Sequence, residues 1–287
     1  MKCDFRRDRS EFWIIIYDND TSYSISTHIK YVSIINFFFP ILEKKSPTKW
    51  KVSERRSDMQ NLWLPKDCCD KRIMENFVEW CRHVTQDILW IYLSKNISPY
   101  FCNELDFCIA SDFNYVYGNG RTEIGEAEYQ LKYNNDTLDF KERKEYADFL
   151  FHKMISNCKY IPIANKEDWL VSPMPSTAIG KQKLAWLLAK AMAVQLDISF
   201  LESKLNCEKP QMKELSIDKK IEVWKQIYKN GYVEISKDIC GKNVLIIDDL
   251  YQSGTTMWQY ASFLKSLGAF RVFGMVCVKS LKDSDNR

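Results

Sequence analysis

One short run near the end of the sequence constrains the fold more than any other feature. Residues 244–247 are four consecutive apolar residues, three of them β-branched, and Asp248 and Asp249 follow directly. Such an unbroken run is typical of a strand that is covered on both faces in a parallel sheet. Across residues 257–264, apolar side chains recur at i, i+3, i+4 and i+7, the spacing of one buried helix face. With the apolar run at 270–278, the stretch predicts strand, loop, helix and strand, with a ligand outside the carboxyl end of the first strand.

The loop inside this unit indicates what the ligand is. It consists of Gln252, Ser253, Gly254, Thr255 and Thr256. The glycine lets the backbone approach a ligand, the three hydroxyl groups add donors, and free N–H groups at the helix start favour an anion, most often a phosphate. Carboxylates facing a phosphate would repel it, so Asp248 and Asp249 fit better as acceptors for sugar hydroxyls or as an attraction for a bridging Mg²⁺. Phosphate, ribose and magnesium together indicate a phosphorylated sugar.

The run from Val244 to Thr256 resembles the phosphoribosyl-pyrophosphate (PRPP) motif of type I phosphoribosyltransferases. The resemblance implies a Rossmann-like α/β fold with a mostly parallel sheet, in which Asp248 and Asp249 hold the ribose 2′- and 3′-hydroxyls. It assigns the 5′-phosphate to the loop from Gln252 to Thr256, and it implies Mg²⁺ as a cofactor that PRPP carries, without direct protein ligands. Gln252 stands where the family usually has Thr or Ser, which removes one hydroxyl contact but leaves the amide contacts.

Two other interpretations of this run are a Walker-B strand and a structural α/β crossover. A Walker-B strand needs a Walker A loop, and the sequence contains no G-x-x-x-x-G-K-[ST]. The crossover interpretation stays open, because it needs no ligand.

More of the chain resembles the ComF-type branch of this family. Residues 130–133 (Gln-Leu-Lys-Tyr) resemble its A-L-K-Y segment, and residues 172–175 (Ser-Pro-Met-Pro) resemble its V-P-V-P strand end. Residues 209–216 contain Lys-Pro-Gln and Leu-Ser and resemble its T-P-Q…L-S segment, so the match spans roughly 124–280. Two features of the branch are missing. No four-cysteine zinc segment is visible in the sequence, and the basic R-G-F-N-Q stretch is Ala-Ile-Gly-Lys-Gln at 178–182.

The resemblance also implies two further ligand-binding segments. The turn after the strand at 169–172 stands where this fold places its pyrophosphate loop, and its candidate donors are Ser176, Thr177 and Lys181. A helix N-cap and a solvated lysine explain these residues equally well. Residues 203–216 match the mobile hood that covers PRPP in the family, and its candidate contacts are Lys204, Lys209 and Lys213. A solvated charged loop is the alternative.

We expect an N-terminal accessory region at 1–120 and a phosphoribosyltransferase-like domain at 121–287. The accessory region resembles no family. Its composition predicts strands at 11–17 and 31–42, a loop or linker at 43–70, and a long helix at 71–95. The strand at 11–17 precedes Asp18-x-Asp20, which is similar to the phosphatase motif D-x-D-x-[TV], but Ser22 breaks the match and a hairpin turn explains it better.

Metal binding by the accessory region finds little support. Four candidate ligands, Cys68, Cys69, Cys81 and His83, lack the paired spacing that zinc sites use, so buried or incidental side chains explain them better.

The composition limits which other classes of protein the chain could belong to. The net charge of +3 neither demands nor excludes nucleic acid. The ten cysteines are scattered and the first residues are polar and charged, so we expect a reducing cytoplasm instead of a disulfide framework. The longest apolar run, 31–42, is too short to span a bilayer, so we expect no membrane segment.

Three functions are consistent with these patterns. The resemblance implies a homodimeric glycosyltransferase that takes phosphoribosyl from PRPP, releases pyrophosphate and uses an acceptor that the sequence does not identify. A non-catalytic PRPP- or nucleotide-sensing module is the second, and Gln252 favours it. The third is an effector or toxin of a bacterial anti-phage or toxin–antitoxin operon, held by a regulatory protein or nucleoprotein partner, which the departures from the family's patterns favour.

Overall fold

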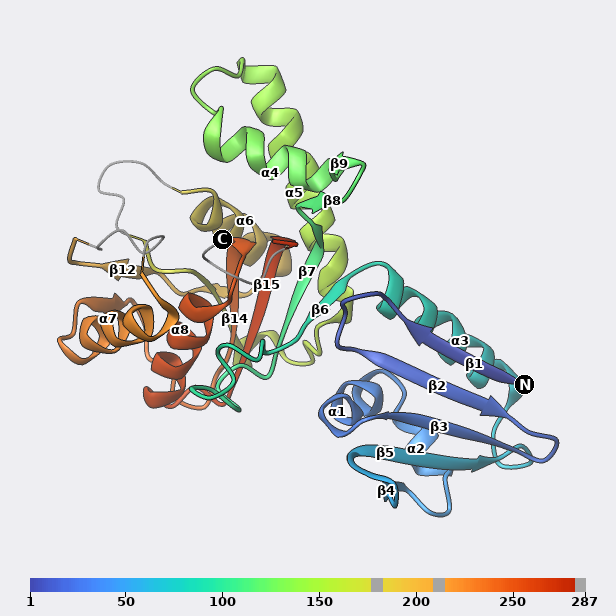
Figure 1. The fold of residues 1–287 in the computed structure, drawn as a ribbon. Coiled ribbons are helices and arrows are strands. Elements are labelled where there is room, and N and C mark those ends of the chain that lie inside the picture. The colour runs from blue at the N-terminus through green and yellow to red at the C-terminus, as the bar shows by residue number, and fades with distance from the viewer. Residues whose placement is uncertain (177–182, 209–214, 282–287) are drawn as a thin grey trace. The chain divides into compact units, whose positions relative to one another are not determined.

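The computed structural model describes residues 1–176, 183–208 and 215–281, which form two compact units (Figure 1). The smaller unit contains Met1–Trp90 with Lys159–Pro162, and the larger unit contains Ile91–Cys158 with the described chain from Ile163 onward. The division therefore lies near Trp90 instead of residue 120. Strand β7 (Phe107–Phe113), which lies inside the expected accessory region, belongs to the sheet of the larger unit.

The larger unit is built on a six-stranded, mostly parallel sheet, which confirms the predicted α/β class. The strand order is β11-β10-β14-β15-β7-β6, and the pairs from β11 to β7 are parallel. The strands besides β7 are β11 (Ser199–Phe200), β10 (Trp169–Pro173), β14 (Asn243–Tyr251), β15 (Arg271–Lys279) and β6 (Leu89–Ile91), of which only Ile91 falls in the larger unit. The predicted strand at 244–247 is the middle of β14, and its four side chains are fully buried.

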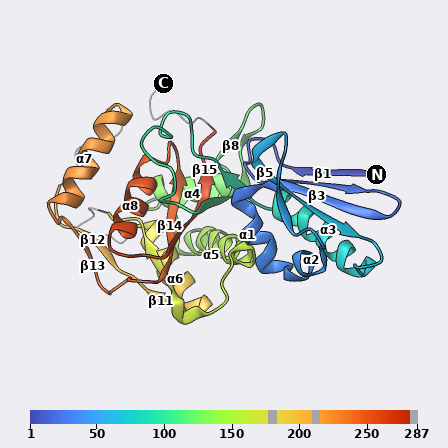
Figure 2. The same ribbon diagram turned by 90° about the horizontal axis from the view of Figure 1, so that it is seen from below.

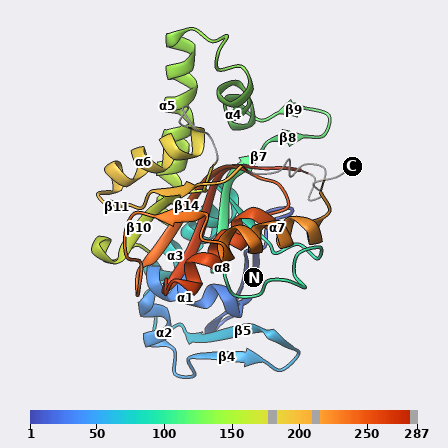
Figure 3. The ribbon, with the colours of Figure 1, turned by 90° about the vertical axis from the view of Figure 1, so that its left-hand side faces the viewer.

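Helices cover both faces of this sheet (Figures 1 and 3). They are α4 (Glu123–Tyr133), α5 (Phe140–Asn157), α6 (Leu184–Leu196), α7 (Ile217–Lys229) and α8 (Thr255–Ser266). On one face, Met154 Sδ of α5 lies 3.3 Å from Cys277 Sγ of β15. On the other, Met257 Sδ of α8 lies 3.5 Å from Cys108 Sγ of β7, and α7 packs outside α8. This double coverage explains why the middle of each central strand is apolar throughout.

Two antiparallel strand pairs complete the larger unit. A hairpin joins β8 (Tyr115–Val116) to β9 (Gly120–Arg121), and β12 (Ser203–Leu205) pairs with β13 (Val233–Ile235). Short helical turns lie at Cys158–Tyr160 and Lys166–Asp168. None of the helices in the described ranges is long and apolar enough to cross a membrane.

The smaller unit is an antiparallel five-stranded sheet with helices on one side (Figure 2). Its strand order is β1 (Lys2–Arg6), β2 (Trp13–Asp18), β3 (Ser22–His28), β5 (Arg56–Pro65) and β4 (Trp50–Ser53). The helices are α1 (Ile29–Phe38), α2 (Pro40–Lys45) and α3 (Lys71–Gln86). Aromatic rings hold this unit together: the Phe12 centroid lies 4.4 Å from that of Tyr31 and 4.8 Å from that of Trp90.

Several predictions for the smaller unit are confirmed. A strand covers most of 11–17, a hairpin turn follows it, and a helix begins at Lys71. That helix ends at Gln86, earlier than expected, because residues 89–91 form β6.

Two predictions for the smaller unit are wrong. The expected strand at 31–42 is two helices, α1 and α2, in which Tyr31, Ile34 and Ile35 are buried at helical spacing and Pro40 opens α2. The expected loop at 43–70 contains β4 and β5. Its polar composition misleads because β5 buries only Met59, Leu62 and Leu64 and leaves its other side chains partly or fully exposed, as in an antiparallel sheet with one solvated face.

Candidate functional site

The acid pair lies at the carboxyl end of β14, where the sheet fixes its backbone. Asp248 pairs in register with Val276 of β15, and the Asp249 amide donates a 2.9 Å hydrogen bond to Asp248 Oδ1. Both side chains are half-buried. The positions of the two carboxylates therefore follow from the strand and not from the loop that comes after it.

Lys132 of α4 reaches this acid pair. Its Nζ lies 3.0 Å from Asp249 Oδ2 and 3.3 Å from Glu128 Oε1, one helical turn earlier. The exposed fractions of the side chains are 28% for Lys132, 16% for Asp249 and 4% for Glu128. The result is a row of charges, Glu128–Lys132–Asp249, at the mouth of the candidate ribose site. Sequence patterns place Lys132 in a family segment but give no sign of this contact, because α4 and β14 are far apart in the chain.

The electrostatics of the cluster follow from burial and from the excess of carboxylates. Burial, and then the neighbouring Asp249, raise the pKa of Asp248, while Lys132 opposes the rise. Burial also raises the pKa of Glu128, again against the effect of Lys132. For Lys132 itself, burial lowers the pKa, but the charges of Asp249 and Glu128 outweigh burial and raise it. Lys132 is thus the cation that lets three carboxyl groups stand close together.

Gly254 of the loop is required for a reason that the sequence does not show. Its φ is +87°, a conformation that L side chains rarely adopt. A Cβ at this position would overlap the Tyr251 ring and hydroxyl, and Trp258 Nε1 holds that hydroxyl by a 3.1 Å hydrogen bond. The glycine thus lets the loop close over Tyr251. The clash with Tyr251 adds to our expectation that a side chain at this position would block a phosphate.

The hydroxyl groups of the loop divide into two kinds. Ser253 Oγ and Thr255 Oγ1 are buried and lie 3.0 Å apart, so they hydrogen-bond to each other. Thr256 is half-buried and Gln252 is exposed. The Thr255 amide donates a 3.4 Å hydrogen bond to Ser253 Oγ, and the next amides in the first turn of α8, which begins at Thr255, have no carbonyl four residues earlier within the helix. The backbone amides and Thr256 are therefore better placed than Ser253 or Thr255 to meet an anion.

A buried lysine supports the loop from β15. Lys279 Nζ donates hydrogen bonds to the carbonyls of Ser280, at 2.9 Å, and Gln252, at 3.4 Å. It also lies 5.7 Å from the centroid of the Tyr251 ring. A positive charge directly behind the loop favours a negative ligand in front of it. The apolar run at 270–278 ends just before this lysine, and nothing in its pattern marks the residue.

The other predicted residues are only partly described. Ser176 is half-buried, and it follows Met174, whose amide donates a hydrogen bond to the Ile247 carbonyl just before the acid pair. Lys204 is exposed on β12. Thr177, Lys181, Lys209 and Lys213 lie outside the described residues. The end of β10 therefore adjoins the acid pair.

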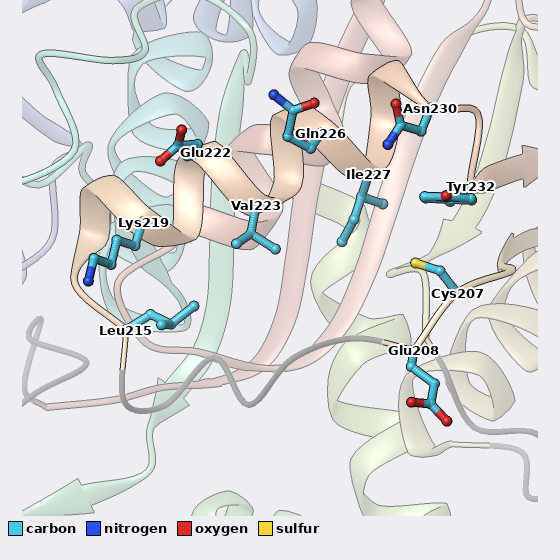
Figure 4. Close-up of a pocket in the computed structure, with 10 residues that line it drawn as sticks. All are labelled: Cys207, Glu208, Leu215, Lys219, Glu222, Val223, Gln226, Ile227, Asn230 and Tyr232. Carbon is cyan, nitrogen blue, oxygen red and sulfur yellow. The ribbon is translucent and has the colours of Figure 1, made fainter.

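A cavity of about 570 Å³ lies along α7 (Figure 4). Its described lining includes Leu215, Val223 and Ile227, with Cys207 from the chain after β12 and Tyr232 from the residue before β13. The acid pair and the loop after it are not among the described lining residues. This cavity is therefore separate from the candidate ribose and phosphate site.

The donor set of the site suits a magnesium ion that a ligand carries. Mg²⁺ prefers carboxylate oxygens and binds mainly through substrate phosphates with one or two carboxylates. Asp248 and Asp249 provide two carboxylates, and among the described residues no group of three His, Cys, Asp or Glu side chains could hold a metal ion alone. Cys68, Cys69, Cys81 and His83 therefore form no such group.

No protein-family model matches this chain, and no curated protein matches it. Several solved structures are similar to about half of it. Adenine phosphoribosyltransferase from Thermoanaerobacter pseudethanolicus is 16% identical over 48% of this chain and 82% of that one, with a TM-score of 0.30. Hypoxanthine phosphoribosyltransferase from Staphylococcus aureus is 15% identical over 49% and 67%, with a TM-score of 0.30. Phosphoribosylpyrophosphate synthetase from Mycobacterium smegmatis is 14% identical over 47% of this chain, with a TM-score of 0.28, and the match spans only 33% of that enzyme. These similarities concern type I phosphoribosyltransferase folds and single out no branch.

Proposed function

We propose that the larger unit binds PRPP at the carboxyl end of β14 and transfers its phosphoribosyl group. One observation carries the proposal: two carboxylates that the sheet holds in place stand directly before a glycine loop that opens a helix. In this arrangement Asp248 and Asp249 accept hydrogen bonds from the ribose hydroxyls. The backbone amides at the start of α8 and the Thr256 hydroxyl bind the 5′-phosphate, and Lys279 adds positive charge behind them.

Lys132 has a defined part in this proposal. A ribose hydroxyl that reaches Asp249 takes the place of the ammonium group that lies 3.0 Å away. Lys132 keeps Glu128 as its second partner, so its charge remains compensated when Asp249 turns to the ligand. Charge-assisted hydrogen bonds of this kind stabilise a complex by about 1.5–3 kcal/mol each.

The proposed reaction breaks the bond between C1 of the ribose and the pyrophosphate oxygen, whose electron pair leaves with pyrophosphate. A new bond forms from C1 to a nucleophile, which loses its proton. Positive charge develops on the sugar in the transition state, and the nearby carboxylates stabilise it. When bound, Mg²⁺ on the pyrophosphate would supply charge neutralisation for the leaving group.

We also propose that the chain belongs to the ComF-like branch, on the sequence resemblance at residues 130–133, 172–175 and 209–216. Lys132, in the first of these segments, lies beside Asp249. The test of transfer is pyrophosphate release from Mg-PRPP in the presence of ammonia and of purine and pyrimidine bases. We expect release with at least one acceptor. Tight binding of PRPP without release with any acceptor would overturn transfer and leave the second candidate, a PRPP-sensing module. The mutual hydrogen bond of Ser253 and Thr255, which occupies one of their two hydroxyl protons, favours that candidate.

A further inference from the structure

The smaller unit carries one sheet face that its own helices leave uncovered. Ile14, Ile16, Ile25 and Leu62 are buried against the helices. Side chains alternate along a strand, so the residues between them point to the opposite face. We call this the open sheet face and define it by Lys2, Asp4 and Arg6 of β1, Trp13, Ile15 and Tyr17 of β2, Ser24 and Ser26 of β3, Asn61 and Trp63 of β5, and Lys51 of β4.

Two large aromatic rings stand exposed in one row of this face. Tyr17 pairs in register with Ser24, and Ser24 pairs with Trp63, so a serine lies between the two aromatic residues. Tyr17 is 39% exposed and Trp63 is 43% exposed. They are two strands apart, which places their backbones about 10 Å from each other. A small serine side chain therefore separates the two rings in this row.

The residues of β3 and β5 beside the two rings are polar. Beside Ser24 lies Ser26, whose hydroxyl donates a hydrogen bond to the Asn61 side chain. Amide and hydroxyl groups of this kind suit a ligand that has both flat rings and hydrogen-bonding edges. An apolar protein partner would cover these groups without taking up the further hydrogen bonds that they can make, which costs free energy.

Positive charge lies on both edge strands of the open sheet face. Lys2 of β1 pairs with Tyr17 in register, and its Nζ lies 5.8 Å from the centroid of that ring. Lys51 of β4 pairs with Asn61. Asp4 is the carboxylate of the face, and Arg6 Nε neutralises it through a 2.9 Å hydrogen bond. Lys2 Nζ also lies 4.0 Å from Asp4 Oδ2, so Lys2, Asp4 and Arg6 together leave one net positive charge on β1, and Lys51 adds a second on β4. A polyanion therefore meets net positive charge at either edge of the sheet.

We propose that the open sheet face binds single-stranded nucleic acid, with bases stacked on Tyr17 and Trp63 and phosphates near Lys2 and Lys51. Stacked aromatic rings in a positively charged groove bind single strands with little sequence preference, because every base has a π-face. A duplex offers no free base faces, so it fits this surface less well. The proposal goes beyond PRPP transfer and does not depend on it.

The test uses the full-length protein and fluorescent oligothymidylate and oligouridylate, with binding followed by anisotropy at low and at physiological salt. The two probes distinguish DNA from RNA, and a duplex of the same length is the competitor. We expect binding of a single strand, which the duplex displaces poorly. Trp63→Ala should weaken binding at least about fivefold, while Trp63→Phe, which keeps a ring, should weaken it less.

Two further variants sharpen the result. Phe270→Ala removes another exposed aromatic ring, 68% exposed and in the larger unit, and should leave binding unchanged. The double variant Lys2→Ala, Lys51→Ala should lower the slope of log affinity against log salt by about 1.4. Circular dichroism verifies that each variant is folded.

Three outcomes would overturn the proposal. Absence of binding at low salt would mean that the two lysines only guard the edge strands against pairing. Unchanged binding by a folded Trp63→Ala variant would mean that nucleic acid binds at another place on the protein. A dimer that Trp63→Ala dissociates in light scattering would make this face an interface between two copies of the chain.

Discussion

Replacing Lys132 by Met tests whether one cation holds the acid cluster together. Met keeps a long apolar side chain but removes the ammonium group that lies 3.0 Å from Asp249 and 3.3 Å from Glu128. Removal of one partner from a buried ion pair costs about 3–5 kcal/mol. Lys132 is 28% exposed and Asp249 is 16% exposed, so solvent offsets part of the loss. We expect about 2–3 kcal/mol at pH 8, which is a fall of about 5–10 °C in melting temperature for a unit of this size.

The loss of stability in Lys132→Met should be smaller at low pH and larger at high pH. The pKa values of Asp248 and Glu128 are raised in the folded protein, so folding is favoured when these groups are protonated, and stability falls as pH rises through the raised values. Without Lys132 both pKa values rise further, and the fall becomes steeper. The pKa of Lys132 is itself raised above the already high value of a free lysine, so the side chain stays charged throughout pH 5–8 and does not change the slope of stability against pH there. The variant should therefore approach the parent in stability at pH 5 and diverge from it at pH 8.

Urea denaturation followed by circular dichroism at pH 5 and pH 8 measures this effect. Lys132→Arg, which keeps the charge, is the matched control, and the double variant Lys132→Met, Glu128→Gln should recover part of the loss because it removes one of the three carboxyl groups. Equal stability of Lys132→Met and the parent at pH 8, or the same loss at both pH values, would refute the role of Lys132.

Three other predictions follow from the loop and the proposed ligand. Gly254→Ala should lower the free energy of unfolding by at least about 1 kcal/mol, measured by urea denaturation, because φ is +87° and the new methyl group meets Tyr251; an unchanged midpoint would contradict this. PRPP with Mg²⁺ should raise the melting temperature in thermal scans, and EDTA should abolish the rise. Light scattering at micromolar concentration should give a homodimer, and a monomer would exclude it.

The strand, loop and helix around the acid pair could be predicted from the sequence because each is coded locally. Residues 244–247 have no polar member, and the spacing at 257–264 fits one helix face, so β14 and α8 are visible without tertiary information. The fold class followed from the alternation of such elements. The division near Trp90 did not, because β7 joins the sheet from a segment with no motif of its own.

The missed features all depend on tertiary contacts. Lys132 meets Asp249 only because α4 packs against the sheet, and Lys279 reaches the loop from the next strand. The run 31–42 is rich in residues that favour strands, yet packing of Tyr31, Ile34 and Ile35 makes it helical, since burial outweighs intrinsic preference. In β5 the sheet buries only Met59, Leu62 and Leu64 of a polar segment, which composition alone makes look like a loop.

Calorimetric titration of Mg-PRPP into the parent and into the double variant Asp248→Asn, Asp249→Asn tests the central claim most directly. Asn keeps the size of each side chain but removes the charges that strengthen the bonds to ribose hydroxyls, so we expect affinity to fall at least about tenfold. Asp106→Asn is the control. It removes a carboxylate whose Oδ1 accepts a 2.8 Å hydrogen bond from Arg271 Nε, at the start of β15. This end of the sheet is opposite the acid pair. We predict that the parent and Asp106→Asn bind Mg-PRPP and that the folded double variant loses most of this affinity. Equal affinity of the double variant and the parent would contradict this prediction.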